Sequence, residues 1–276
     1  MRQPERRVER RPRGIPLRAV VPNAVTALAL CSGLTGIRYA IAAFQSGDPG
    51  DWERALAFVV IAAVLDGMDG RIARMLNGQS RFGAELDSLS DVIAFGVSPA
   101  IIIYLWSLQN FPRFGWIFAL AHAVCAALRL ARFNAQIDVE EQPHKSAGFL
   151  TGVPAPAGAG LLLLPLYLWL WTDQDIFREP WVVAPWAALV AFLMVSNVAT
   201  FSWTSLRLRS HVRLWAIVVI ALLGAALFSA PWPALSLSAM LYAALIPASL
   251  YAYGRVKKQR AGAARAAAPS SDESSA

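Results

Sequence analysis

Four aspartates interrupt an otherwise apolar part of the chain, and their type and spacing make them the strongest candidates for chemistry. Asp66 and Asp69 are three positions apart, and Asp87 and Asp91 are four positions apart. In a helix, either spacing places both carboxylates of a pair on one face. Four carboxylates that share a pocket of low dielectric cannot all stay ionised without cations. The pattern therefore predicts a cation site formed by two helices.

The ligand chemistry indicates divalent metal ions. Carboxylate oxygens are hard ligands that suit magnesium or manganese, and the stretch 61–100 supplies neither histidine nor cysteine beside them. Four carboxylates can hold two divalent cations in the arrangement that enzymes use for phosphoryl displacement. We therefore expect two cations, Mg²⁺ or Mn²⁺, to be bound by Asp66, Asp69, Asp87 and Asp91.

The residues around the aspartates favour a phosphate-containing ligand. Gly67, Gly70 and Gly83 each cost about 1 kcal/mol relative to alanine inside a helix, and they make sense where a nucleotide approaches the backbone closely. Arg74 lies one turn beyond Gly70 and can neutralise phosphate oxygens with its planar guanidinium group. A single intramembrane aspartate would equally suit a proton relay or a helix-pairing contact. Four aspartates accompanied by these glycines and this arginine favour a metal site that binds phosphate.

The elements that must position these residues are membrane-spanning helices. Hydrophobic residues make up 57% of the chain and charged residues 16%, whereas a soluble protein has about 25% charged residues. This composition also excludes a disordered chain, which would be polar and rich in charge. Each crossing needs roughly 20 mostly apolar residues. Eight segments qualify and predict an all-α polytopic membrane protein with about eight transmembrane helices, at about 19–44, 54–76, 84–106, 114–133, 152–171, 181–200, 212–230 and 232–253.

One transmembrane domain accounts for most of the chain. We expect a transmembrane catalytic domain at 19–253, a basic cytoplasmic arm at 1–18 and a disordered cytoplasmic tail at 254–276. A short break at 77–83 lets the second and third spans run antiparallel, so that their acidic faces can meet. The arm carries seven arginines, and we expect it to lie on anionic lipid.

The basic residues set the expected orientation. With the N-terminus inside and eight spans, 21 of the 25 lysines and arginines fall on the cytoplasmic side. Both termini and the acidic cluster are therefore expected to face the cytoplasm. The net charge of +7 does not indicate nucleic acid as a partner, because the basic residues cluster at the ends of apolar segments rather than on one basic surface.

The aspartates and their neighbours also match a known sequence signature. All of its fixed positions are present, in the order Asp66-x-x-Asp69-Gly70-x-x-Ala73-Arg74, eight residues, Gly83-x-x-x-Asp87-x-x-x-Asp91. In this respect the chain resembles the CDP-alcohol phosphatidyltransferase family. The resemblance implies an integral-membrane enzyme that moves a phosphatidyl group from a CDP-linked lipid to the hydroxyl of an alcohol and releases CMP.

The same resemblance implies a role for each matched residue. One metal ion would be bound by Asp66, Asp69 and Asp87. The second would be bound by Asp66, Asp87 and Asp91, with Asp91 also acting as the general base. Gly70, Arg74 and Ser80 occupy positions where the family contacts the CDP moiety. The full set implied to bind the CDP-lipid is Gly70, Ala73, Arg74, Ser80, Gly83, Asn23 and Thr26.

The signature leaves the acceptor alcohol open, and other segments bear on it. They resemble the bacterial phosphatidylserine synthases that lie wholly in the membrane, and they are found at 22–26, 87–100, 128–134, 149–156 and 194–197. Val153 is a small departure, since leucine is expected there. The resemblance implies CDP-diacylglycerol as donor, L-serine as acceptor, a location in the bacterial cytoplasmic (inner) membrane, and a homodimer.

The residues themselves support serine less directly. Arg129, Arg132 and Asn134 lie at the cytoplasmic end of the fourth predicted span and could clamp the serine carboxylate, or could anchor lipid phosphates instead. Asn197 could line the pocket or pair two helices. Glycerol 3-phosphate, inositol phosphate and choline remain alternative acceptors. Outside the enzyme class, a cation transporter could also place four aspartates in adjacent helices.

Overall fold

Helices account for nearly all of the chain that the structure describes. The structure is a computed structural model, and it describes residues 17–111, 113–137, 149–196, 199–201, 210–247 and 249. The predicted tail, nearly all of the predicted N-terminal arm and Asn197 lie outside these residues. Within them, the predicted helical class is confirmed, apart from one pair of three-residue strands.

The first half of the chain forms long helices separated by short turns. In order they are α1 (Leu17–Ser46), α2 (Pro49–Met75), α3 (Arg81–Asp91), the π-helical turn η1 (Val92–Val97), α4 (Ser98–Trp106), the 3₁₀ turn η2 (Leu108–Asn110) and α5 (Gly115–Ile137). The second half holds shorter elements, namely β1 (Phe149–Thr151), α6 (Ala155–Leu162), α7 (Leu164–Thr172), the 3₁₀ turn η4 (Asp175–Arg178), α8 (Pro180–Val195), β2 (Ala199–Phe201) and α9 (Ser210–Ser229). A helical segment at 231–247 follows. β1 and β2 pair antiparallel with Phe149 opposite Phe201, which ties the chain before α6 to the chain after α8.

Local sequence defines the turn between α2 and α3. Asn77 follows α2 with a positive φ of 49°, a conformation that asparagine tolerates better than most residues. Ser80 then caps α3, because its hydroxyl oxygen accepts a hydrogen bond of 3.0 Å from the backbone N–H of Gly83. The break is therefore shorter than the predicted 77–83, since the Ser80 cap starts α3 before the predicted break ends.

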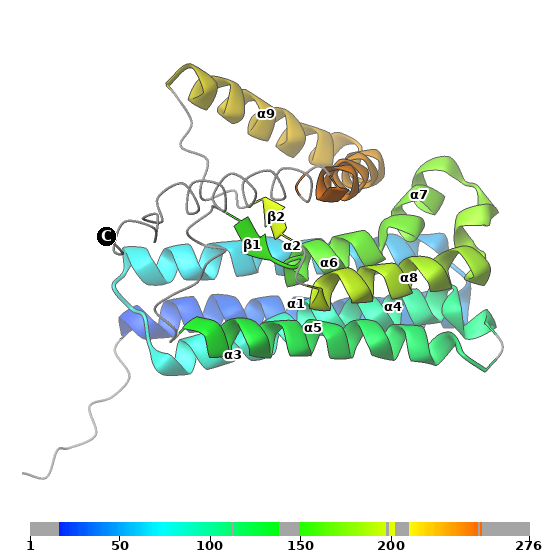
Figure 1. Ribbon diagram of the computed structural model, residues 1–276, viewed down its shortest axis with the longest axis horizontal. Helices are drawn as coiled ribbons and strands as arrows, with labels where there is room; N and C mark the ends of the chain where they lie inside the picture. The colour runs from blue at the N-terminus through cyan, green and yellow to red at the C-terminus, as the bar shows by residue number, and fades with distance from the viewer. Residues whose placement is uncertain are drawn as a thin grey trace, which may run out of the picture.

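The long helices form a bundle that holds the α2–α3 hairpin against α1. In Figure 1 the axes of α1, α2, α4 and α5 run roughly side by side, with α6 and α8 along one side and α9 projecting away. α1 makes its most extensive contacts with α2 and also packs on α3 and α4, while α5 packs on α8. Helix α1 thus contacts both helices that carry aspartates.

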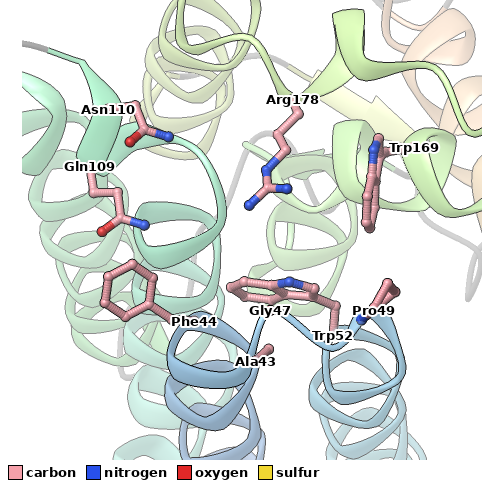
Figure 2. Close-up of a pocket in the computed structure, with 9 residues that line it drawn as sticks. All are labelled: Ala43, Phe44, Gly47, Pro49, Trp52, Gln109, Asn110, Trp169 and Arg178. Carbon is pink, nitrogen blue, oxygen red and sulfur yellow. The ribbon is translucent and has the colours of Figure 1, made fainter.

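The bundle has polar groups at both of its ends. At the end where α2 begins, a cavity of about 290 Å³ lies between residues of α1, α2, η2, α7 and η4 (Figure 2). Asp66 is seventeen residues beyond Pro49 on the same helix. At about 1.5 Å per residue this is about 26 Å along the axis, close to the roughly 30 Å hydrocarbon thickness of a bilayer. The cavity and the aspartates are therefore separate sites.

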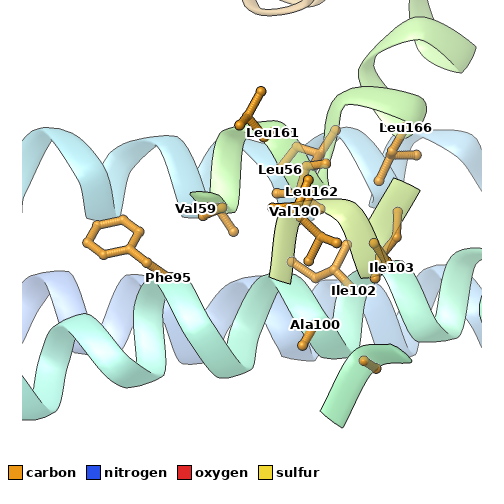
Figure 3. Packing of buried hydrophobic residues seen from close by; sticks show 14 of the residues in the cluster. Leu56, Val59, Phe95, Ala100, Ile102, Ile103, Leu161, Leu162, Leu166 and Val190 are labelled. Carbon is orange, nitrogen blue, oxygen red and sulfur yellow. The ribbon is translucent and has the colours of Figure 1, made fainter. Parts of the chain in front are cut away.

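The apolar core lies between α2, η1, α4, α6 and α8. Leu56 of α2, Phe95 of η1, Ile103 of α4 and Leu162 of α6 are almost wholly buried there (Figure 3). Lipid tails are as apolar as these side chains, so helices in a membrane associate chiefly through close packing rather than through exclusion of water. The fit of these side chains therefore matters more than their total apolar area.

Glycines let α1 and α5 approach the chain around η1 closely. A Cβ atom on Gly33 of α1 would lie 2.9 Å from the Cα atom of Ala94. One on Gly96 would lie 2.9 Å from the Cβ atom of Ala126 on α5. Small residues at such contacts are typical of transmembrane helix packing. The π-helical turn is thus held between α1 and α5.

A buried histidine supports the π-helical turn that directly follows Asp91. His122 of α5 is 0% exposed, and its Nε2 atom lies 3.3 Å from the carbonyl oxygen of Phe95, to which an Nε2–H donates. Turns of this kind interrupt the usual helical hydrogen bonding and are frequent at functional sites. The contact couples α5 to the helix that carries Asp91.

Three helices of the described chain are long and apolar enough to cross a membrane, namely Val20–Ser46, Arg81–Trp106 and Gly115–Ala135. α6 and α7 together form a fourth if their 42° bend belongs to one broken span. Pro165 explains this bend, because it lies at the start of α7 and cannot donate a helical hydrogen bond. These long apolar helices are consistent with the predicted membrane protein. The predicted count of eight spans is not confirmed, since α2 carries the charges of the acidic site and α8 has 16 residues.

Replacing Gly33 with alanine should destabilise the bundle, because the added methyl group would collide with the backbone of Ala94. We expect a loss of about 1–3 kcal/mol, the usual cost of overpacking a core, and a lower melting temperature of the detergent-solubilised protein. Gly160→Ala is the matched control, because a Cβ atom there meets no described atom within 4 Å. Equal melting temperatures for the two variants would contradict the close packing of α1 on η1.

Candidate active site

The acidic faces of α2 and α3 meet. Asp66 and Asp69 of α2 and Asp87 of α3 each offer a carboxylate oxygen, and the three oxygens lie within 4.8 Å of one another. Asp69 is 5% exposed, whereas Asp66 and Asp87 are partly exposed. Like charges this close repel one another strongly where solvent is scarce. Hard oxygen ligands in such a group suit a divalent cation, so the cluster could hold a metal ion.

Asp91 joins the group from the last position of α3. Its carboxyl lies beside that of Asp66, with Asp87 and Asp69 nearby. Its Oδ1 atom is buried and has no hydrogen-bond partner among the described residues. Buried charges are normally paired or coordinate metals. The four aspartates therefore fit a divalent-metal site, with Asp91 supplying an otherwise unsatisfied oxygen.

Helix α1 fixes one of the aspartates directly. Thr26 is buried and donates a hydrogen bond of 2.6 Å from Oγ1 to Oδ2 of Asp69. The backbone carbonyl of Thr26 accepts a second bond, of 3.3 Å, from the hydroxyl of Ser90 on α3. Thr26 therefore connects α1 to both acidic helices and lies behind Asp69.

Asn23 lies one turn before Thr26 and faces the start of α3. A Cβ atom on Gly83 would lie 2.7 Å from Oδ1 of Asn23 and 3.1 Å from Oγ of Ser80. Any side chain at Gly83 would displace these polar groups, which accounts for the glycine. The hydroxyl oxygen of Ser80 accepts the capping bond of α3, and its proton remains able to donate to a ligand.

α2 presents open backbone beside the aspartates. A Cβ atom on Gly67 or Gly70 would meet no described atom within 4 Å. Ala73 is partly exposed, and Arg74 is exposed and forms no ion pair within the described part of the chain. Packing of the described residues does not require glycine at either position. The arrangement instead suits close approach of a ligand to this backbone.

Two of the polar residues near the end of α5 are brought to the acidic group. Arg129 is partly buried, its charge interacts with that of Asp91, and its Nε atom lacks a hydrogen-bond partner in the described ranges. Asn134 donates a hydrogen bond of 2.9 Å from Nδ2 to Oγ of Ser88, which lies between the two aspartates of α3. Arg129 therefore lies near Asp91, and Asn134 contacts α3 between its two aspartates.

The other two residues predicted for the acceptor are placed differently. Arg132 donates from Nη1 to the carbonyl oxygen of Val195 at 3.4 Å. Val195 ends α8, where carbonyls lack partners within the helix, so this contact caps a helix end. Asn197 lies outside the described residues.

Two residues near the site were not predicted from the sequence. Tyr242, in the helical segment 231–247, is partly buried and lies near Arg129. Ser88 accepts the hydrogen bond of Asn134. The one sequence cue for Ser88 is its place beside Asp87. Tyr242 offers none, because contacts between distant helices are not encoded in local spacing.

Comparison with known proteins identifies the family. A sequence model described as CDP-alcohol phosphatidyltransferase matches residues 19–203, a range that includes all four aspartates. The chain belongs to this family. The membership predicted from the spacing of the aspartates is therefore confirmed.

Three relatives that are similar to the chain carry the same name. The CDP-diacylglycerol–serine O-phosphatidyltransferase of Mycobacterium tuberculosis is 36% identical over 220 residues, which cover 80% of this chain and 74% of that protein. The protein of the same name from Mycobacterium leprae is 34% identical over 232 residues, covering 84% of this chain and 75% of the relative. A third, from Helicobacter pylori, is 43% identical over 113 residues, or 41% of this chain and 45% of the relative. The similarity to the mycobacterial proteins thus spans most of both chains.

Asp87→Asn should weaken the binding of Mn²⁺, because it removes one of the three clustered carboxylates. We expect the dissociation constant to rise at least about tenfold, on the scale of effects seen when metal-site residues are replaced. The measurement is titration of purified protein with Mn²⁺, with the unbound ion quantified by electron paramagnetic resonance.

Glu85→Gln is the matched control for this titration. Glu85 lies two residues earlier on α3, is exposed and is not part of the cluster, so its substitution removes the same charge. Its affinity for Mn²⁺ should match that of the unmodified protein. Equal affinities for the Asp87 and Glu85 variants would show that the cluster does not hold the metal.

Proposed function

We propose that the chain transfers the phosphatidyl group of CDP-diacylglycerol to the hydroxyl of L-serine, giving phosphatidylserine and CMP. The observation that carries the proposal is the convergence of the four signature aspartates of α2 and α3 into one group. Membership of the family supports a CDP-linked donor. The names of the mycobacterial relatives support serine as the acceptor.

Two divalent cations, Mg²⁺ or Mn²⁺, complete the proposed site. Asp66, Asp69 and Asp87 hold one of them, and Asp66, Asp87 and Asp91 hold the second. When bound, the cations supply positive charge to the diphosphate of the donor. The spacing of the clustered oxygens and the unpartnered Oδ1 atom of Asp91 support this assignment.

The donor in this proposal keeps its tails in the bilayer and its CDP group over the open part of α2. Gly70 lets the nucleotide approach the backbone, and Arg74 binds phosphate oxygens one turn further along. The hydroxyl of Ser80 donates a hydrogen bond to the CDP group. The remaining residues assigned to the CDP-lipid are Ala73, Gly83, Asn23 and Thr26, which shape the surface around these contacts.

Asp91 acts as the general base. It takes the proton of the serine hydroxyl, and the serine oxygen attacks the phosphorus atom that bears diacylglycerol. A new oxygen–phosphorus bond forms while the bond from that phosphorus to the CMP oxygen breaks, and CMP leaves with the electron pair. Arg74 stabilises the negative charge of the departing phosphate.

Arg129 is the residue best placed to bind the serine carboxylate. It lies near Asp91, and its Nε atom donates to no described residue, so its planar guanidinium group has a donor available for a carboxylate. Asn134 supports the same side of the pocket through Ser88. Arg132 contributes less because it binds the end of α8. Asn197 remains a further candidate for this pocket.

The proposed membrane organisation follows the distribution of basic residues. Eight spans form a transmembrane catalytic domain at 19–253 in the bacterial cytoplasmic membrane, with both termini and the aspartates on the cytoplasmic side. The basic arm at 1–18 and the tail at 254–276 flank this domain on the cytoplasmic side. Two copies of the chain form a homodimer.

The function is tested by measuring CMP release in mixed micelles of detergent and CDP-diacylglycerol with Mn²⁺, one acceptor at a time. Release should require L-serine, and EDTA or Asp91→Asn should abolish it. Asp173→Asn is the control, since Asp173 is exposed at the far end of α7. Release only with glycerol 3-phosphate, inositol phosphate or choline would contradict the acceptor. No release from folded protein with any acceptor would favour a cation transporter.

Arg129→Lys should raise the Michaelis constant for serine about tenfold, the scale of one charge-assisted hydrogen bond. Lysine keeps the charge but cannot reproduce the planar fork that a carboxylate accepts. Arg132→Lys is the matched control and should leave this constant nearly unchanged, because Arg132 contacts Val195. A larger effect at Arg132 than at Arg129 would contradict the assignment.

A further inference from the structure

The cavity at the end of the bundle opposite the aspartates is lined by groups that together suit an anion. Arg178 of η4 reaches into it between Trp169 of α7 and the two amides of η2, Gln109 and Asn110, with Trp52 of α2 on the facing side (Figure 2). Arg178 is the one charged side chain among the residues that line it, and no carboxylate does. The cavity is thus a positively charged recess in a bundle end rich in aromatic residues.

Arg178 is held in place by contacts that leave its terminal nitrogens available. Its Nε atom donates a hydrogen bond of 3.1 Å to the carbonyl oxygen of Trp106, and its guanidinium carbon lies 5.6 Å from the centre of the Trp169 ring. Its own carbonyl oxygen accepts a 2.7 Å bond from the hydroxyl of Ser107. Within the described residues, neither terminal nitrogen makes a hydrogen bond or an ion pair. The guanidinium group is therefore oriented but its charge is not neutralised.

No carboxylate of the described residues is directly paired with Arg178. The one ion pair found among these residues joins Asp51 to Arg54. A partly buried cation without a counter-charge is unfavourable unless an anion binds it. The planar guanidinium group matches phosphate oxygens well, because two parallel N–H donors can bind two oxygens.

The amides beside Arg178 add hydrogen-bond donors directed at the same space. Gln109 uses one N–H of its amide on the carbonyl oxygen of Leu105, which leaves the second N–H available. The side chain of Asn110 also lines the cavity and makes no hydrogen bond to any described residue. Together with Arg178 they offer several donors and no negative charge, which is the composition expected of a phosphate site.

The position of the cavity at the end of the bundle favours a lipid as the source of the phosphate group. Trp52 and Trp169 belong to the aromatic residues at this end, and tryptophan is enriched where a bilayer meets water. The volume of about 290 Å³ lies just below the roughly 300–1,000 Å³ of typical small-molecule pockets, so it suits a headgroup rather than a whole lipid. Phe44, 51% exposed at the rim, offers an apolar surface to the acyl chains.

We propose that this cavity binds the phosphate group of a phospholipid in the leaflet opposite the aspartates. Arg178 pairs with the phosphate oxygens, Gln109 and Asn110 donate to the remaining oxygens, and the acyl chains leave past Phe44. The site is distinct from the CDP-lipid site, because it lies at the other end of α2 and contains no acidic residue.

The test is native mass spectrometry of delipidated protein in detergent, titrated with phosphatidylglycerol, with inorganic phosphate, or with diacylglycerol that lacks a phosphate. At a subsaturating lipid concentration, unmodified protein should bind one more phosphatidylglycerol than the Arg178→Gln variant. The dissociation constant for that lipid should be at least about tenfold higher in the variant. Diacylglycerol should show no difference between the two proteins. Excess inorganic phosphate should compete only weakly, because it lacks the acyl contacts.

A second variant keeps the test valid if loss of Arg178 destabilises the fold. Asn110→Asp places a negative charge in the cavity without removing a described contact, and it should weaken phosphatidylglycerol binding by a similar factor. Gln174→Glu, which adds the same charge at an exposed site that does not line the cavity, should bind the lipid normally. Equal lipid binding by the Asn110 and Gln174 variants would overturn the proposal. Binding of inorganic phosphate as tight as that of the lipid would overturn the lipid assignment.

Discussion

The structure depends on bringing four carboxylates together where water is scarce. The oxygens of Asp66, Asp69 and Asp87 lie within 4.8 Å, and Asp91 touches Asp66. In the absence of cations this arrangement opposes folding of the α2–α3 hairpin, because like charges repel more strongly at low dielectric. The surrounding helices must therefore stabilise the hairpin by contacts elsewhere. Divalent cations bound between the carboxylates would offset this repulsion by attracting all of them.

Helix α1 supplies most of these stabilising contacts. Thr26 binds Asp69 at one level, and one turn earlier Asn23 packs against Gly83 where α3 begins. Deeper in the bundle, the hydroxyl of Ser98 donates a 2.8 Å hydrogen bond to the carbonyl oxygen of Gly33, whose missing side chain lets η1 approach. α5 completes the support from the other side through His122 and Ala126. The helix after Asp91 is thereby fixed between two neighbours.

Much of the acidic site could be predicted from the sequence, because spacing of three or four residues and a break between helices are local properties. The directions of side chains beyond those helices could not. Arg129 and Arg132 share a face of α5 by spacing, yet Arg129 is partly buried near Asp91 and Arg132 binds the end of α8, a difference made by tertiary contacts. The bend at Pro165 likewise divides a predicted span, because an apolar run by itself does not reveal its hydrogen bonding.

The central claim is that cations held by the aspartates contact the diphosphate of the donor. Pulsed electron–nuclear double resonance can test it directly, because Mn²⁺ reports any phosphorus nucleus bound nearby. Protein loaded with Mn²⁺ should show coupling to ³¹P when CDP-diacylglycerol is added, and Asp66→Asn should lose that coupling. The opposite result would be Mn²⁺ that binds the unmodified protein but shows no ³¹P coupling when the donor is present. That result would contradict contact between the cations and the diphosphate.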